Sequence, residues 1–432
     1  MKKITPTLFS KTGLAILGLF ILTFSGCVRQ EASKVETPEK VAVENSADPE
    51  FAKAQKLIEE MADSPVGYNR LTTLYIKKAR ETGDFSLNTK AEDAADNALK
   101  IKADDPVARK LKASLQLTFH RFDKALELGK QLEKDFPTDA FVMGVLTDAN
   151  SELGNYDAAF EYGQKMIDTK PNTSSYARAA HLRSLDGAHD GAIELFKQAA
   201  RSADPTDKES QSWCLVQLGD ELWKYGKYAE AEKVYDEALA NFPNYYLALA
   251  GKGKIRAAQG DFENAVKILN DSLNRIPNVE NAILLGDIYT KQGNTELAKQ
   301  QYELVQVIEQ KIGVNTDQKR LAMLWADQNI KLDEALEIAT REHEQRKDIF
   351  TADTLAWVLY KKGNFAEAKK ASVEAMRLKT KDARILYHAG MIEKELGDKT
   401  EAVKLLKKAI ETNPKFDLLQ AEVAQKTLHE LS

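Results

Sequence analysis

Apolar residues return along this chain at intervals of three and four positions, and the whole pattern recurs about every 34 residues. The clearest copy lies between residues 215 and 243, with Leu215, Leu218 and Leu222 before a glycine, Gly226, and with Ala231, Tyr235 and Ala238 after it. Such spacings place apolar side chains on one face of a helix. Each copy therefore predicts two amphipathic helices joined by a short turn.

A small residue near the start of the second predicted helix marks each copy. These markers are Ala91, Ala125, Ala159, Ala192, Ala231, Ala265, Ala298, Ala335, Ala368 and Ala402. Successive markers are 33 to 39 residues apart, which predicts ten repeats. The two longest steps end at Ala231 and Ala335, and they predict a longer loop in the first case and, near Gly313, a turn where the array bends in the second.

Glycines occupy one position of several first helices, although a glycine inside a helix costs about 1 kcal/mol relative to alanine. They are Gly219, Gly253, Gly286 and Gly390. Helix axes that lie about 8–10 Å apart require small residues where they cross, so we expect these glycines to face the marker alanines. One hairpin cannot bury its apolar face alone, so the copies are expected to stack, with an amphipathic helix after Phe416 as a cap.

The unit resembles the tetratricopeptide repeat, a helix-turn-helix of 34 residues. A second strong match lies between residues 386 and 414, through Leu386, Gly390, Gly397 and Ala402. The resemblance implies an all-α fold, a right-handed superhelical solenoid of helix-turn-helix repeats with a concave and a convex side. In proteins of this family, ligands commonly lie along the concave face made by the first helices.

The repeat alignment places a set of side chains on that concave face, where the resemblance implies a groove for a protein or peptide partner. The set is Asp148, His181, Asp220, Lys254, Asp287, Trp357 and Met391 at one repeated position, with Trp223, Tyr360 and Tyr387 close by. Aromatic side chains there suit an extended peptide or a sugar. They are equally suited to packing between hairpins, and the sequence leaves both interpretations open.

The first 26 residues have the parts of an export signal: a basic start, an apolar stretch and small residues before Cys27. An apolar run of about 14 residues is short for a membrane span, which needs about 20. The ending Phe24-Ser25-Gly26-Cys27 resembles the lipobox of bacterial lipoproteins, which implies cleavage before Cys27 and a lipid on its thiol. The alternative is an uncleaved signal anchor with an incidental cysteine.

Composition divides the rest of the chain. Residues 27–50 are small, charged and proline-containing, which predicts a lipid-attached flexible linker between the signal peptide of residues 1–26 and the repeats. The repeats are expected to form an N-terminal part over 51–310 and a C-terminal part with the capping helix over 311–432. A formal net charge of -5, with Lys and Glu alternating along the helices, argues against nucleic acid as a partner.

Catalytic, metal-binding and cofactor-binding patterns do not stand out. The six histidines lie in different repeats without HExxH spacing, and the chain has neither a GxSxG sequence nor a complete phosphate-binding loop. Cys214 lies in an apolar helical stretch and is expected in the core, with no disulfide. The sequence therefore predicts no enzymatic activity and no cofactor.

Two functions follow as hypotheses. The first is a membrane-tethered scaffold that binds a protein segment in its groove, in the bacterial cell envelope. Val28 after the cysteine resembles lipoproteins of the outer membrane, so the periplasmic side of that membrane is the expected location. The second is a glycan-binding or polysaccharide-export accessory lipoprotein that stacks sugars on the groove aromatics.

Overall fold

The structure is a computed structural model that describes residues 48–312 and 318–432. The chain divides into two compact units, Met1–Val43 and Glu44–Ser432, and everything described below lies in the second.

Several sequence predictions concern residues that the structure does not describe. The signal peptide, the lipid attachment at Cys27, most of the linker and the turn near Gly313 all lie outside the described residues. They remain predictions.

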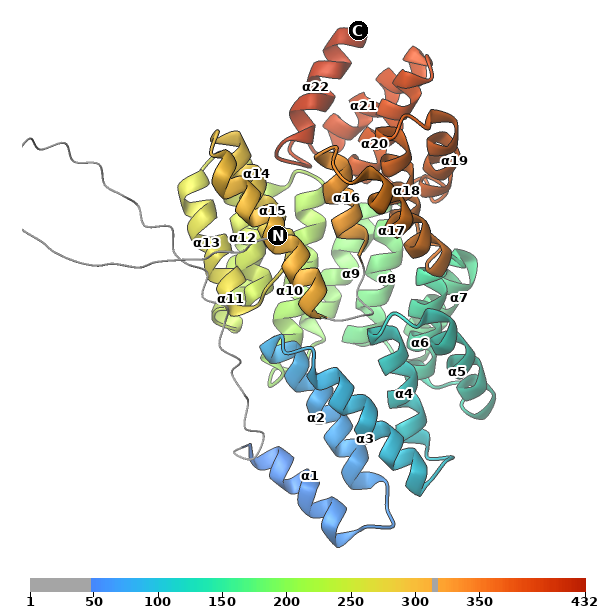
Figure 1. The fold of residues 1–432 in the computed structure, drawn as a ribbon. Coiled ribbons are helices and arrows are strands. Elements are labelled where there is room, and N and C mark those ends of the chain that lie inside the picture. The colour runs from blue at the N-terminus through green and yellow to red at the C-terminus, as the bar shows by residue number, and fades with distance from the viewer. Residues whose placement is uncertain (1–47, 313–317) are drawn as a thin grey trace, which may run out of the picture. The chain divides into compact units, whose positions relative to one another are not determined.

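The described residues form twenty-two α-helices and no strand, which confirms the all-α fold and its solenoid of helical repeats (Figure 1). After α1 (Pro49–Glu60), ten helical hairpins follow, which we number as repeats 1 to 10. They are α2 (Val66–Thr82) with α3 (Leu87–Ile101), α4 (Pro106–Thr118) with α5 (Phe122–Asp135), α6 (Ala140–Glu152) with α7 (Tyr156–Thr169), α8 (Thr173–Leu185) with α9 (His189–Arg201), α10 (Lys208–Lys224) with α11 (Tyr228–Asn241), α12 (Tyr246–Gln259) with α13 (Phe262–Arg275), α14 (Val279–Lys291) with α15 (Thr295–Ile312), α16 (Lys319–Asp327) with α17 (Leu332–Gln345), α18 (Ile349–Lys361) with α19 (Phe365–Ala375), and α20 (Ala383–Glu395) with α21 (Lys399–Thr412). A last helix, α22 (Gln420–Leu431), follows repeat 10.

All ten marker alanines lie on the second helix of a hairpin. Nine of them have no exposed surface, and Ala298 is 4% exposed. The prediction of ten repeats is therefore confirmed.

The helix glycines pack differently from the expectation. A Cβ added at Gly219 would meet the ring of Tyr235, and one added at Gly390 would meet the side chain of Leu406. In both hairpins the partner is the large residue four positions after the marker alanine, one helical turn further along the second helix. The glycine thus makes room for a bulky side chain, and the marker alanine is not its partner.

Seven of the ten first helices begin at a side-chain cap; α2, α12 and α16 do not. Asp139, Asp348 and Asp382 each accept hydrogen bonds from backbone N–H groups in the first turn of the helix that follows. Such caps satisfy donors that the helix leaves free and stabilise it by about 1 kcal/mol each. The sequence therefore fixes where these first helices start.

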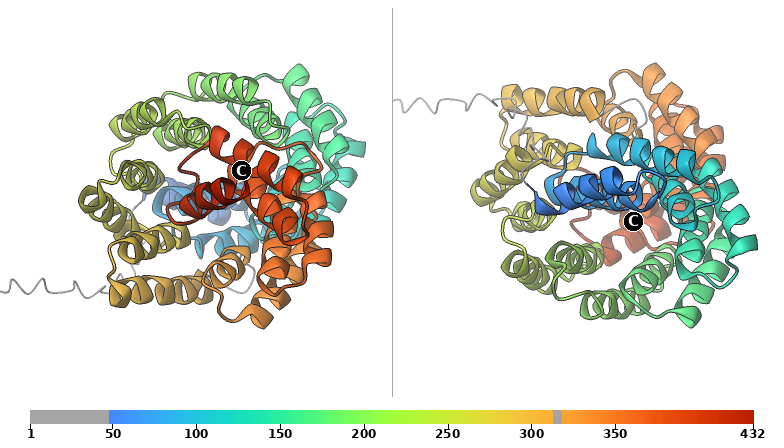
Figure 2. Two further views of the ribbon diagram at one scale, coloured as in Figure 1. Left: turned by 90° about the horizontal axis from the view of Figure 1, so that it is seen from above. Right: turned by 90° about the horizontal axis from the view of Figure 1, so that it is seen from below.

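The array also makes contacts over long distances in sequence, whereas repeats in a solenoid usually touch only their neighbours. Arg80, at the end of α2, pairs with Glu209 at the start of α10, with 3.2 Å between Nη2 and Oε2. Near the other end, Lys291 of α14 pairs with Glu422 of α22. The helices of this unit follow a curve that returns onto itself (Figure 2).

Repeats 3 and 4 share a hydrophobic cluster with repeats 9 and 10. Tyr156 and Leu182 contribute from the first pair, and Ile349 and Ile385 contribute from the second. All four side chains are almost fully buried. Burial of apolar surface contributes about 25 cal/mol per Å², so this cluster stabilises the curvature as well as the individual repeats.

Candidate functional site

Several predicted groove residues join one first helix to the next. Asp148 of α6 accepts two hydrogen bonds from the guanidinium of Arg178 on α8, at 2.9 and 2.7 Å. Asp220 of α10 lies 3.3 Å from the ammonium nitrogen of Lys254 on α12. These side chains are partly buried, and part of their charge is already balanced within the protein.

Trp223 belongs to the same group. The ammonium of Lys254 lies 4.6 Å from the centre of the Trp223 ring, a cation–π contact. Tyr235 donates its hydroxyl hydrogen to Asp220 at 2.7 Å, so the carboxylate holds two partners at once. Trp223 is half-buried, and its indole N–H has no hydrogen-bond partner among the described residues.

The predicted aromatics of repeats 9 and 10 are packed inside the protein. Trp357 is 1% exposed, donates its indole hydrogen to Asp327 at 2.8 Å, and stacks between Tyr360 and His388. Tyr387 is equally buried and donates to Gln420 at 2.8 Å.

Met391 is also buried, and Tyr360 is half-buried against the Trp357 ring. Trp357, Tyr387 and Met391 are therefore withdrawn from any surface that a partner could contact. For Trp357 and Tyr360, the interpretation as packing between hairpins is the one that matches the structure.

His181 and Asp287 complete the predicted set. His181 of α8 is exposed. Asp287 of α14 is half-buried, and its carboxylate accepts a hydrogen bond from Tyr302 at 2.8 Å. Burial, reinforced by the carboxylates of Asp417 and Asp327, raises the pKa of Asp287 to about 8. The Asp287 carboxyl therefore holds its proton through much of the neutral range.

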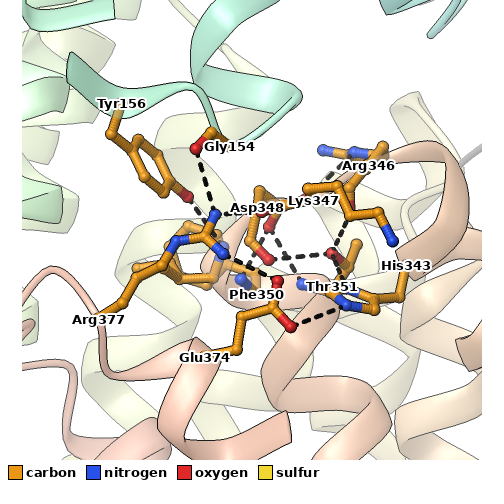
Figure 3. Close-up of polar contacts among 11 residues, drawn as sticks. Gly154, Tyr156, His343, Arg346, Lys347, Asp348, Phe350, Thr351, Glu374 and Arg377 are labelled. Atoms are coloured by element: carbon orange, nitrogen blue, oxygen red, sulfur yellow. Dashed lines mark hydrogen bonds and ion pairs between the residues drawn. The ribbon is translucent and has the colours of Figure 1, made fainter.

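A second group of residues, which the sequence did not reveal, joins repeat 3 to repeats 8 and 9. We call it the closure contact; its members are Glu152, Gly154 and Tyr156 on one side and Arg346, Lys347, Ile349 and Arg377 on the other. Figure 3 shows five of them, Gly154, Tyr156, Arg346, Lys347 and Arg377. Arg346 pairs with Glu152, and the Tyr156 hydroxyl accepts a hydrogen bond from the backbone N–H of Ile349 at 2.9 Å. Arg377 donates to the backbone carbonyls of Gly154 and Lys347.

Among the charged members of the closure contact, the ion pair of Arg346 with Glu152 is the best shielded from water, whereas Lys347 and Arg377 are exposed. Arg346 has a side chain that is only 10% exposed and lies 5.2 Å from the centre of the Phe122 ring. Burial raises the pKa of Glu152 despite the nearby Arg346 charge, and it raises the pKa of Tyr156 to about 12. A buried guanidinium thus pairs with a carboxylate that is 30% exposed, and loss of either partner leaves a partly desolvated charge without its counter-ion.

No sequence signal identifies the closure contact. The interacting residues are almost 200 positions apart, and Gly154 is one of several turn glycines that look alike. Only the curvature of the array brings them together.

Other kinds of site were searched for among residues 48–312 and 318–432. Within these ranges, no three His, Cys, Asp or Glu side chains are grouped so that they could hold a metal ion. None of the helices in the described part is both long and apolar enough to cross a bilayer. Cys214 is buried, as expected, and burial raises the pKa of its thiol to about 12.

Family models of the tetratricopeptide repeat match residues 216–281, 279–309 and 383–416. A TPR repeat-containing protein, MJ1428, of Methanocaldococcus jannaschii is 32% identical over 164 residues, which cover 37% of this chain and 27% of that protein. The Hsp70-Hsp90 organizing protein of Triticum aestivum is 24% identical over 185 residues, 42% of this chain and 29% of that protein. The chain thus contains tetratricopeptide repeats and spans less than a third of the length of these relatives.

Solved structures show a looser similarity. A human IFIT1 dimer with PPP-AAAA aligns with 83% of this chain and 84% of its own, at 12% identity and a TM-score of 0.47. PilW, described as a widely conserved type IV pilus biogenesis factor, aligns with 48% of this chain and 94% of its own, at 16% identity and a TM-score of 0.41.

Proposed function

We propose that this solenoid of tetratricopeptide repeats is a membrane-tethered scaffold, which binds a charged segment of a protein partner along its first helices. Proteins built from these repeats generally serve as non-catalytic scaffolds for protein–protein interaction. The name of the wheat relative, Hsp70-Hsp90 organizing protein, refers to other proteins and agrees with such a role.

One observation supports a charged partner in particular. The predicted groove residues that keep solvent contact are mainly polar: His181 is exposed, and Lys254 and Asp287 are partly exposed. They stand at the same repeat position on α8, α12 and α14. A peptide that carries negative charge fits such a row, because Lys254 supplies a positive charge and the protonated Asp287 carboxyl supplies a hydrogen-bond donor.

The same residues weigh against the glycan hypothesis. Sugar binding by stacking needs an accessible aromatic face. Trp357 and Tyr387 are each 1% exposed, and the face of Trp223 is covered by Lys254. The protein-binding hypothesis is therefore the one we carry forward.

The tether and the location in the cell envelope rest on the sequence around Cys27. One acyl chain binds a membrane weakly, whereas two or more anchor a protein stably. Mass spectrometry of the N-terminal peptide tests the proposal: a lipidated Cys27 as first residue is expected, and an unmodified thiol on an uncleaved chain would refute it. The variant Cys27→Ser should leave the membrane fraction.

Partner binding is tested by crosslinking the full chain in its native membrane and identifying the captured protein. The double variant His181→Ala with Lys254→Ala should weaken partner binding by about thirtyfold, because two lost contacts at about 1 kcal/mol each sum to about 2 kcal/mol. The matched control is Lys267→Ala, which alters an exposed lysine on the second helix of repeat 6. Equal capture by the double variant and the control would rule out this binding surface.

A further inference from the structure

The curved array stacks on itself in a regular way. Each hairpin has a turn between its two helices, and a joining segment leads from one hairpin to the next. A Cβ added at Gly83, in the turn of repeat 1, would meet the side chain of Ile276, in the joining segment after repeat 6. One added at Gly154, in the turn of repeat 3, would meet the carbonyl oxygen of Lys347, after repeat 8. In both cases a turn lies against the joining segment that follows the repeat five places further along the chain.

Both kinds of surface are left uncovered at the ends of the described array. A Cβ added at Gly363 or Gly397, in the turns of repeats 9 and 10, would have no heavy atom of the described chain within 4 Å beyond its own neighbourhood. Val107 and Phe141, which follow the joining segments before repeats 2 and 3, are 50% and 44% exposed. Helices α4 and α20 lie in opposite parts of this unit (Figure 1). The array therefore presents uncovered turns at one end and uncovered helix starts at the other.

The uncovered turn of repeat 9 matches the covered turn of repeat 3. The first reads Gly363-Asn364-Phe365 and the second Gly154-Asn155-Tyr156, and the two glycines have φ of 80° and 72°. Tyr156 is 6% exposed, because the start of repeat 9 packs against it. Phe365 occupies the same place in its turn and is half-buried. Repeat 9 thus presents a second surface of the kind that already binds a helix start in repeat 3.

The start of α6 matches, in the same way, the start of α18. Asp348 caps α18 and accepts a hydrogen bond from the backbone N–H of Phe350 at 2.7 Å, and Asp139 caps α6 and accepts one from Phe141 at 2.9 Å. Phe350 packs against the hydrophobic cluster that contains Tyr156. Phe141 has the same position in its helix, but it keeps 44% of its surface exposed. The two surfaces that meet inside the array are thus repeated, without a partner in the described chain, at its two ends.

We propose that a second copy of this chain docks at these ends, with the start of its α6 on the turn of repeat 9. The contact reproduces the one that the start of α18 makes with the turn of repeat 3. Phe141 of the docked copy lies beside Phe365 and beside Leu396, a 44% exposed side chain in the neighbouring turn of repeat 10, and burial of these side chains drives the association.

Such an association is head-to-tail, because two different surfaces meet. Each pair of copies keeps one free surface of each kind, so further copies can add at both ends. The proposal is independent of the proposed binding of a protein partner along the first helices.

The test is sedimentation velocity of the full chain in detergent, with micelles in excess so that two chains rarely share one. The sedimentation coefficient of the wild type should rise as the protein concentration increases to about 100 μM. Phe141→Ser and Leu396→Gln should each weaken association by about tenfold, because each variant removes apolar surface from the contact. The matched control is Val373→Ser, which changes a 57% exposed valine of α19 outside both surfaces and should leave association unchanged. A constant sedimentation coefficient for the wild type would overturn the proposal.

A mixture of the two variants tests the head-to-tail arrangement, once circular dichroism has shown that each keeps its helices. Phe141→Ser keeps the turn surface and Leu396→Gln keeps the α6 surface, so the mixture has one intact contact between unlike chains. The mixture should form pairs with the affinity of the wild type and few longer chains. If the mixture forms no more pairs than each variant alone, or if Val373→Ser weakens association as much as Phe141→Ser does, the proposal is wrong.

Discussion

The turns of repeats 3 and 10 have nearly the same sequence but different surroundings. Gly154 follows Leu153 and Gly397 follows Leu396, and both glycines have a left-handed backbone, with φ of 72° and 85°. A Cβ added at Gly154 would meet the carbonyl oxygen of Lys347 and the guanidinium of Arg377. One added at Gly397 would have no heavy atom within 4 Å beyond its own neighbourhood.

The comparison of the two turns separates a local reason for glycine from a reason that depends on distant parts of the chain. Both turns favour glycine because a side chain disfavours the left-handed backbone, although the equivalent turns of repeats 2 and 8 have His120 and Asn329 there. Only the turn of repeat 3 also lies against another part of the chain, at the closure contact (Figure 3). The same local sequence thus has a second role where the array returns onto itself.

The largest expected effect comes from substituting the two glycines. Gly397→Ala should lower the free energy of unfolding by about 1–2 kcal/mol, the cost of a left-handed backbone for an L-residue. Gly154→Ala should lower it by about 3 kcal/mol or more, because crowding at the closure contact adds to that cost. Urea denaturation of both variants measures the difference. Equal losses would mean that the contact near Gly154 contributes nothing to stability.

Removal of a buried charge at the closure contact should have a similar, slightly smaller effect. Arg346→Ala leaves Glu152 and Asp348 without their cation and should cost about 3 kcal/mol, whereas Lys399→Ala, beside the free turn of repeat 10, should cost less than about 0.5 kcal/mol. The double variant Arg346→Ala with Glu152→Ala should cost less than the sum of the two single variants, because the second change removes the carboxylate left without its cation. Thermal unfolding gives the readout, and strictly additive losses would contradict a direct pairing.

A smaller effect is expected from the Tyr156 hydroxyl. Tyr156→Phe removes the acceptor of the buried Ile349 N–H, and an unsatisfied buried donor costs about 1–2 kcal/mol. Tyr162→Phe in the same repeat removes a partly exposed hydroxyl that donates to Glu133, and it should cost less than about 0.5 kcal/mol. Hydrogen exchange at Ile349 should accelerate only in the first variant. Similar exchange in both variants would show that the Tyr156 contact does not form in solution.

The smallest effect depends on pH. It tests a second interaction between residues far apart in sequence, the repulsion between Asp287 of repeat 7 and Asp417 after repeat 10. The folded protein binds the Asp287 proton more tightly than the unfolded chain, because the pKa rises from 3.8 to about 8 on folding. This contribution to stability is complete below about pH 4 and declines as pH rises toward 8.

Asp287→Asn should therefore reduce the fall in unfolding free energy between about pH 4 and pH 8 by about 1 kcal/mol. The effect is modest because the side chain keeps some contact with water, which screens its charge. Asp271→Asn, an exposed residue of α13, should leave the fall unchanged. Urea midpoints over this range provide the measurement. Parallel curves of stability against pH for Asp287→Asn and the wild type would show that folding does not raise the pKa of Asp287.

The sequence by itself determined the repeats. Periodic apolar residues, turn glycines and capping aspartates act over fewer than five residues, and they fixed the hairpins and the ten buried marker alanines. It also indicated the register of His181, Lys254 and Asp287 on their helices. These features are predictable because helix formation depends on local spacing.

Only the tertiary structure decided which of these residues are accessible. Trp357 and Met391 share a register with the exposed His181, and Tyr387 lies one helical turn before Met391, but all three are buried in one hydrophobic cluster of the C-terminal repeats. The closure contact depends on the angle between successive repeats, which accumulates along the array. Side-chain packing sets a small rotation between each repeat and the next, and the sum of these rotations brings residues almost 200 positions apart into contact. No short sequence pattern predicts that sum.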